Sequence, residues 1–361
     1  MNPYDIELLP IDFKKDMELM KLLVKAKELY CTYNTIIKYQ GLDPLVLLKP
    51  FIKQESFKSC QLAGTCVTQS DLYYIKYNEL NDDIHEINNY MNILFDINKY
   101  VSKSDKLSLN FINKIHNDLL KSKRGTRRRP GSFREIFMWI GPRGAGIEKA
   151  EYIPIAPNKI DNAMTNFLEY YNKNFSMDHL IDIAISHAQF ENIHPYQDGN
   201  GRIGRILIPI QGYLKGNVFI SLFISEAIKS DEYSYYNRLH DTRNNKWENW
   251  VKFFLEIVIK QLTKNIYRLE CVDKVYKEDI ELFKKILPQK NYYKILNYLM
   301  ANISTTILEA STILEIDYQT TRNYLNKLLN NGILTKHKIK NGEYVYIYIK
   351  MYQIHVPVDW L

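Results

Sequence analysis

The residues best suited to chemistry lie in one segment, residues 194–205, which reads His-Pro-Tyr-Gln-Asp-Gly-Asn-Gly-Arg-Ile-Gly-Arg. Pro195 disfavours helix at the residue before it, so an apolar helix that runs up to Ile193 should end there. A second helix should begin near Arg202. Two glycines around an asparagine let the backbone turn its amides inward, and inward amides at a helix N-terminus suit a phosphate. The segment therefore predicts a helix-loop-helix with an anion site in its loop.

Four side chains of this segment have complementary roles at such a site. His194 has a pKa suited to accepting a proton near neutral pH, and Asp198 is a hard oxygen ligand that suits Mg²⁺ beside phosphates. Arg202 and Arg205 are three residues apart, so both can face the loop from the first turn of the second helix. A polar turn with capping residues is the alternative, but turn chemistry does not require these four residues together. The predicted nucleotide-binding residues of the segment are Gly199, Asn200, Gly201, Arg202 and Arg205.

The same segment resembles the signature of the Fic family, His-x-Phe-x-(Asp/Glu)-Gly-Asn-Gly-Arg-x-x-Arg, with Tyr196 in place of the usual Phe. The resemblance implies a protein adenylyltransferase, which transfers AMP from ATP to a Ser, Thr or Tyr hydroxyl of a target protein or of itself and releases pyrophosphate. His194 would then be catalytic, and Asp198 would hold the Mg²⁺ that accompanies ATP. The family's Tyr-Tyr-x-x-Leu element, matched at residues 235–239, would place Tyr236 beside the nucleotide.

Residues 53–65 resemble the inhibitory segment of many Fic proteins, (Ser/Thr)-x-x-x-Glu-(Gly/Asn). Ser59 and Gly64 match this pattern, but the glutamate position is Ala63. In the family that glutamate pairs with the second motif arginine, here Arg205, and blocks productive placement of the ATP γ-phosphate. Because a methyl group cannot form this ion pair, we expect Arg205 to be free to hold nucleotide. An ordinary helix end capped by Gly64 is compatible with this prediction.

Residues 134–156 alternate between apolar and polar positions around a glycine-rich turn, which predicts a β-hairpin. In the family this hairpin is a flap over the active site. Its exposed edge would hold an extended segment of the target protein by main-chain hydrogen bonds. A hairpin that only closes the bundle is the alternative. The basic run at 121–131 before it suits either nucleic acid or solvent.

Most of the remaining chain has helical periodicity, which favours a mainly α fold in which the Fic-like helical bundle carries the β-hairpin flap. The predicted helices cover 14–32, 45–60, 71–100, 107–121, 159–172, 178–193 and 247–262. Three histidines on these helices are expected to be structural rather than catalytic: His116, His179 and His187. The predicted domains are an N-terminal helical domain with the inhibitory-like segment (1–100), the catalytic core (101–265) and a C-terminal domain (266–361).

The C-terminal domain resembles a winged helix-turn-helix. Its signals are helices near 290–300, 310–314 and 323–331, followed by strands at 333–338 and 343–349. Thr320 to Arg322 would open the recognition helix. Few charged residues lie on that helix, so DNA binding and a docking or dimerising role are both expected alternatives. Relatives often dimerise, so a homodimer is also expected.

The bulk composition sets broad limits on the function. A chain of 361 residues suggests two or three domains, and 46% hydrophobic residues is ordinary for a soluble protein. The net charge of +7 allows nucleic-acid contact without requiring it. The four cysteines match no zinc-site spacing and predict reduced thiols in a cytoplasmic protein. Neither a signal peptide nor a stretch long enough to span a bilayer is evident, so no membrane partner is expected.

Two other functions remain open on these residues. The first is a DNA-binding regulator whose Fic-like core senses a nucleotide. The second is a Fic enzyme that transfers another phosphate-linked group, such as UMP, GMP or phosphocholine, because the motif does not select the base.

Overall fold

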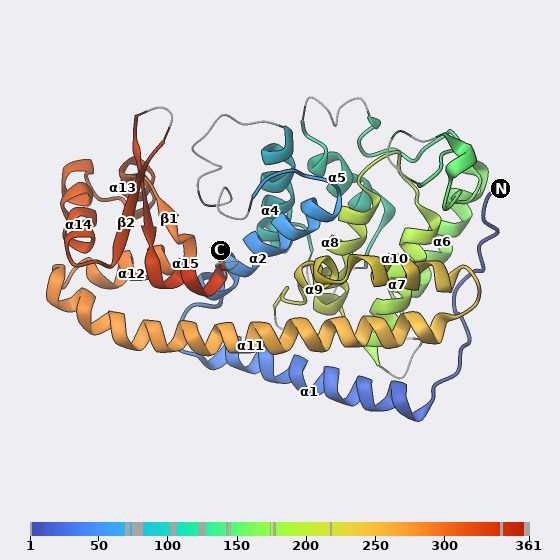
Figure 1. The fold of residues 1–361 in the computed structure, drawn as a ribbon, viewed down its shortest axis with the longest axis horizontal. Coiled ribbons are helices and arrows are strands. Elements are labelled where there is room, and N and C mark those ends of the chain that lie inside the picture. Colours follow the sequence, from blue (N-terminus) through green and yellow to red (C-terminus); the bar gives the residue numbers. More distant parts are fainter. Residues whose placement is uncertain are drawn as a thin grey trace.

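The computed structural model describes residues 2–68, 73, 82–101, 106–122, 128–141, 144, 146–173, 175, 178–216, 219–339 and 342–356. Most of them are helical, which confirms the predicted mainly α fold (Figure 1). The helices before the C-terminal part are α1 (Met17–Tyr39), α2 (Pro44–Leu62), α4 (Asp82–Tyr100), α5 (Leu109–Leu119), α6 (Ile160–Tyr171), α7 (His179–Ile193), α8 (Asn200–Leu214), α9 (Ser225–Ser230), α10 (Glu232–Thr242) and α11 (Trp247–Ile286). The predicted helix at 71–100 is described only from Asp82, apart from Tyr73; the rest of it lies outside the described residues.

Helix α7 lies at the centre of the bundle. Every residue from Leu180 to Ile193 is buried, as expected for a helix whose apolar residues are spread around its whole circumference. It packs against α6, α8, α10 and α11, and α8 in turn contacts α2, α4 and α5. The loop between α7 and α8 is therefore held between two buried helices.

Helix α11 is much longer than the sequence predicted. We expected it to end at Leu262, but it runs to Ile286 and lies alongside α1 (Figure 1). Buried residues that include Leu269, Val272 and Phe283 continue the apolar face of the helix beyond Leu262. The charged residues of this part lie on its other faces, so the amphipathic pattern, and with it the helix, extends to Ile286. The predicted domain boundary at 265/266 falls inside this helix.

The C-terminal part contains the predicted helices and strands in the predicted order, together with a short strand, β1, and a last helix, α15, that were not predicted. It comprises α12 (Tyr292–Asn302), β1 (Ser304–Thr305), α13 (Ile307–Leu314), α14 (Tyr318–Asn330), β2 (Leu334–Lys338), β3 (Tyr344–Tyr348) and α15 (Ile349–His355). The strands form an antiparallel sheet in the order β1-β3-β2, in which Thr335 lies opposite Ile347. Thr306 and Asp317 cap the N-termini of α13 and α14 with their side chains.

The hairpin predicted at 134–156 does not form as two strands. Among its described residues, one β-bridge joins Ile140 to Tyr152, and residues 147–149 form a 3₁₀ turn. Residues 142, 143 and 145 of the glycine-rich turn lie outside the described residues. The start of this segment is bonded elsewhere, because the Arg134 amide donates to the Pro195 carbonyl (2.9 Å). Its first residues are therefore tied to the loop between α7 and α8 rather than to a partner strand.

None of the helices in the described part of the chain combines the length and the apolar character needed to cross a bilayer.

Candidate functional site

A cavity of about 740 Å³ opens at the loop between α7 and α8. Its walls come from this loop, the end of α2, helix α10, and the bridge at Ile140 and Tyr152. All the site residues predicted from the sequence line it: Ala63, His194, Asp198, Gly199, Asn200, Gly201, Arg202, Arg205 and Tyr236. The fold thus brings together residues that are up to 173 positions apart in the chain.

His194 ends α7 in a left-handed conformation (φ 50°, ψ 61°), which is unusual for a residue other than glycine. Pro195 excludes continued helix there. The strained turn is held by the buried Arg134, whose Nε donates to the His194 carbonyl (2.9 Å) and whose Nη2 donates to the Ile155 carbonyl (2.6 Å). Arg134 therefore fixes the residue that is predicted to be catalytic, a role that sequence reasoning missed.

The loop then turns into α8 through Gly199, which has a positive φ of 81° and needs the freedom of glycine. The Asn200 side chain braces the loop by accepting from the Tyr196 amide (2.9 Å) and donating to the Tyr196 carbonyl (2.8 Å). The first amides of a helix have no acceptor within the helix, so those of Asn200, Gly201 and Arg202 can bind an anion from the cavity. This geometry fits the predicted phosphate site except at Gly199, whose amide donates to Asp198 Oδ1 (2.6 Å) and not into the cavity.

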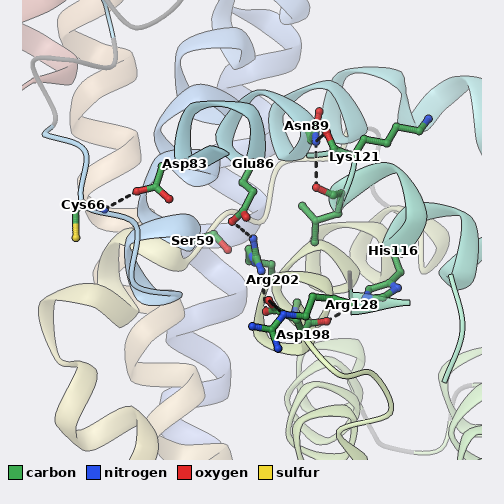
Figure 2. A network of polar contacts seen from close by, with 12 residues as sticks. Ser59, Cys66, Asp83, Glu86, Asn89, His116, Lys121, Arg128, Asp198 and Arg202 are labelled. Carbon is green, nitrogen blue, oxygen red and sulfur yellow. Dashed lines mark hydrogen bonds and ion pairs between the residues drawn. The ribbon is translucent and has the colours of Figure 1, made fainter. Parts of the chain in front are cut away.

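Arg202 lies between two carboxylates (Figure 2). Its Nη1 pairs with Glu86 Oε2 on α4, and its Nη2 pairs with Asp198 Oδ1 (3.1 Å). Arg202 and Glu86 are both buried, so each charge depends on the other for compensation. Spacing along the chain gave no signal for Glu86, because it lies 116 residues from its partner.

Arg205 is not free, in contrast to the expectation from the sequence. Its Nε donates to the Ser59 hydroxyl (2.8 Å) and its Nη2 to the Ser59 carbonyl (2.9 Å). Ser59 lies on the last turn of α2, so the segment that lacks the glutamate still reaches the arginine with a neutral group. Arg205 Nη1 lies against Gly201, 3.0 Å from the position that a Cβ atom would occupy at residue 201.

Ala63 is the C-cap of α2 and borders the cavity. Gly64 follows with φ 92°, so the predicted glycine-capped helix end is confirmed. A longer side chain at position 63 would start from the wall that also contains Arg205.

Burial and nearby charges shift two titratable groups of α7 in opposite directions. Burial, with smaller contributions from Arg134 and Arg243, lowers the pKa of His194 to about 3, well below the value near neutral pH expected from the sequence, so its imidazole is neutral at physiological pH. Burial raises the pKa of Glu191 to about 7, although Arg205 and Arg243 act against this. Among the described residues, Glu191 Oε1 has no hydrogen-bond partner. Sequence reasoning missed Glu191, because its environment is created by packing.

The part of the cavity wall that α10 contributes is aromatic and basic. Tyr236 is 49% exposed and faces the cavity, whereas Tyr235 is buried and its hydroxyl bonds His187 Nε2 (2.8 Å). His187 therefore has the structural role predicted for it. Arg243, at the end of α10, packs 3.4 Å above the Tyr152 ring and donates to Asn192 Oδ1 (2.9 Å). No sequence pattern had singled out Arg243.

Among the residues that the structure describes, no group of three or more His, Cys, Asp or Glu side chains is placed to hold a metal ion. Asp198 contributes one partly exposed carboxylate at the phosphate site. This donor set fits Mg²⁺, which commonly takes one or two carboxylates together with phosphate oxygens and water.

Comparison with known proteins identifies the fold of this region. Residues 106–211 match the model of the Fic/DOC family. A probable protein adenylyltransferase of Aquifex aeolicus is 36% identical over 59 residues, which is 16% of this chain and 18% of that protein. The match thus covers less than a fifth of this relative.

Two solved structures share the fold at low sequence identity. A Fic family protein from Desulfovibrio desulfuricans has a TM-score of 0.61 at 16% identity, over 93% of this chain and 97% of the other. A Fic domain containing signaling protein from Bacteroides thetaiotaomicron has a TM-score of 0.53 at 22% identity, over 70% and 97%. These likenesses establish the fold alone.

Proposed function

We propose that this protein, whose residues 106–211 form a Fic/DOC family domain, is a protein adenylyltransferase that transfers AMP from ATP to a hydroxyl group of a protein. The observation that carries the proposal is the cavity that brings His194, Asp198 and both motif arginines together at the N-terminus of α8. The relative from Aquifex aeolicus, named a probable protein adenylyltransferase, supports the same reaction class.

In this reaction the hydroxyl oxygen of the target attacks the α-phosphorus of ATP. The bond from the α-phosphorus to the bridging oxygen breaks, and pyrophosphate leaves. His194 accepts the hydroxyl proton, for which its neutral imidazole is in the required state. Arg134 holds the His194 carbonyl and so fixes the start of the loop from which the imidazole projects.

The α8 amides would donate hydrogen bonds to the triphosphate, and the positive charges of Arg202 and Arg205 beside them would offset part of its negative charge. Asp198 would hold Mg²⁺, which offsets phosphate charge when bound. Tyr236 and Arg243 also line the cavity, and the nucleoside would lie beside them.

The direct test is incubation with α-labelled ATP and Mg²⁺, read by intact mass for an added AMP. Wild type should label itself or an added target, whereas His194→Ala should bind ATP and transfer nothing. Equal labelling by His194→Ala would overturn the proposal. A panel of UTP, GTP and CDP-choline tests whether the enzyme transfers another phosphate-linked group.

We also propose that the end of α2 lacks the family's glutamate brake, because Ala63 carries no carboxylate and Ser59 holds Arg205 through neutral groups. Ala63→Glu should lower labelling sharply, whereas Ala63→Gln, of similar size and without charge, should lower it little. Equal effects of the two changes would show that steric blocking, and not an ion pair with Arg205, is responsible.

The target protein would dock along residues 134–141, whose backbone is bridged only at Ile140 in the described part. Ile136, Phe137 and Trp139 are each more than two-fifths exposed, and Trp139 also lines the cavity. The same surface would serve in self-modification. Phe137→Ala should weaken labelling of an added target without changing ATP affinity, because Phe137 does not line the cavity.

For the C-terminal part we propose a winged helix-turn-helix, on the order of its elements and its antiparallel β2-β3 hairpin. Arg322 on α14 and Lys336 and Lys338 on β2 are exposed, which suits DNA phosphates. Thr321 is buried instead of facing outward. DNA binding remains a proposal, and a salt-dependent gel shift that Lys336→Glu abolishes would support it.

A further inference from the structure

His116, on α5, is hydrogen-bonded at both of its ring nitrogens. Its Nδ1 accepts from the Gly131 amide (2.8 Å), and its Nε2 lies 3.0 Å from the Asp198 carbonyl oxygen (Figure 2). A backbone amide can only donate and a carbonyl can only accept. The two partners therefore define one neutral tautomer, in which Nε2 carries the proton and donates it to Asp198.

The ring cannot easily leave this position. It is fully buried and stacks on Tyr196 at 3.8 Å between ring centroids, with 12° between the planes. The Tyr196 hydroxyl in turn donates to Asn113 Oδ1 (2.6 Å), one turn earlier on α5. Helix α5 thus contacts the loop at two residues, Tyr196 and Asp198.

The contact at Asp198 controls the direction of the next amide. A trans peptide is planar, so its N–H points opposite to its carbonyl. With the Asp198 carbonyl held by His116, the Gly199 amide points the other way and donates to Asp198 Oδ1 (2.6 Å). The same oxygen accepts from Arg202 Nη2 (3.1 Å). Gly199 has the backbone freedom to allow a peptide flip, so an external contact is needed to select one orientation.

We propose that His116 is a positioning residue of the phosphate site, which fixes the Asp198–Gly199 peptide plane and with it the Asp198 carboxylate and the Gly199 amide. The proposal rests on the function proposed above, because the ligand of this loop is taken to be the triphosphate of a nucleotide. His116 acts from α5, which the sequence had assigned only to packing.

Two substitutions separate this role from a merely structural one. In His116→Gln the side-chain amide reaches the position of Nε2 and can still donate to the Asp198 carbonyl. In His116→Asn the shorter amide ends near the position of Nδ1, so it can accept from the Gly131 amide but cannot reach the Asp198 carbonyl to donate to it. If His116 acted only through packing, the two variants would have similar affinities for ATP, because both lose the ring that stacks on Tyr196.

The affinity for ATP with Mg²⁺, measured by calorimetry, should stay within about threefold of wild type in His116→Gln. It should fall about tenfold or more in His116→Asn, since one buried hydrogen bond and the orientation that it selects are lost. Equal affinities in the two variants would refute the proposal. A wild type that binds no nucleotide would refute the proposed function instead.

A second measurement needs no nucleotide. Asp-Gly occurs once in the chain, at 198–199, so labelling Asp carbonyls with ¹³C and Gly amides with ¹⁵N isolates the Gly199 amide as one NMR signal. This amide should exchange slowly with solvent in wild type and in His116→Gln. In His116→Asn its signal should shift and its exchange should be at least about tenfold faster, because the bond to Asp198 Oδ1 is no longer selected. An unchanged signal in His116→Asn would overturn the proposal even if the protein binds ATP.

Discussion

Replacing Glu191 with glutamine should stabilise the protein in neutral to alkaline solution and have little effect in acid. Glu191 lies one helical turn before His194. Its carboxyl group packs against Gly204 of α8, and only 8% of the residue is exposed. Burial raises its pKa from 4.5 to about 7, which means that the folded protein disfavours the ionised form.

The size of the effect follows from that pKa. The unfolded chain releases the proton near pH 4.5 and the folded chain near pH 7, so the folded state loses stability as the pH rises between these values. At about 1.4 kcal/mol per pH unit, the full loss is about 3 kcal/mol and is complete above pH 7. Glutamine has nearly the same shape and no charge, so the variant avoids this loss.

The assay is urea unfolding of wild type and Glu191→Gln at several pH values from about 4 to 8. The variant should be nearly as stable as wild type at the acid end and about 3 kcal/mol more stable at the alkaline end. Glu169→Gln, at an exposed position on α6, is the matched control and should show no such trend. A difference that stays constant with pH would refute the reasoning, since it would reflect packing and not ionisation.

Three further predictions concern the same region. Glu86→Gln removes the buried partner of Arg202 and should lower the free energy of unfolding by about 3 kcal/mol, measured in urea; a loss below about 1 kcal/mol would mean that the pair is hydrated. Arg134→Lys replaces the separate guanidinium nitrogens that bond the His194 and Ile155 carbonyls with a single ammonium nitrogen, so His194 should shift and AMP transfer should slow by about a hundredfold with ATP affinity retained; an unchanged rate would argue against this anchoring. Burial lowers the pKa of His187 from 6.5 to about 3. Between these two pH values the imidazole binds a proton in the unfolded chain but not in the folded chain. Wild type should therefore lose about 1.4 kcal/mol per pH unit relative to His187→Gln on acidification from pH 6.5, and parallel curves for the two proteins would contradict this.

Local patterns were enough to predict most helices and the loop at the centre of the site. Pro195 and Gly199 set the ends of α7 and α8 through their own backbone preferences, and both act within one or two residues. The apolar periodicity of α2 and the glycine after it likewise predicted where α2 ends.

The predicted hairpin at 134–156 shows where such patterns are insufficient. Alternation of apolar residues is compatible with a strand, but a strand also needs a partner. Arg134 instead bonds to the carbonyls of His194 and Ile155, and among the described residues of this segment only Ile140 and Tyr152 meet as a bridge. The competing partner is 60 residues away, so no local pattern contains it.

Amino-acid types alone were enough to identify the motif residues and to predict the short-range geometry that points their amides toward one cavity. This was possible because φ and ψ preferences and helix ends are local. Tertiary packing decided which groups those residues meet. Glu86 on Arg202, Ser59 on Arg205 and His116 on the Asp198 carbonyl all come from other helices. The pKa of Glu191 depends on burial between α7 and α8. Hydrogen bonding and desolvation depend on distance in space, and spacing along a chain does not encode that distance.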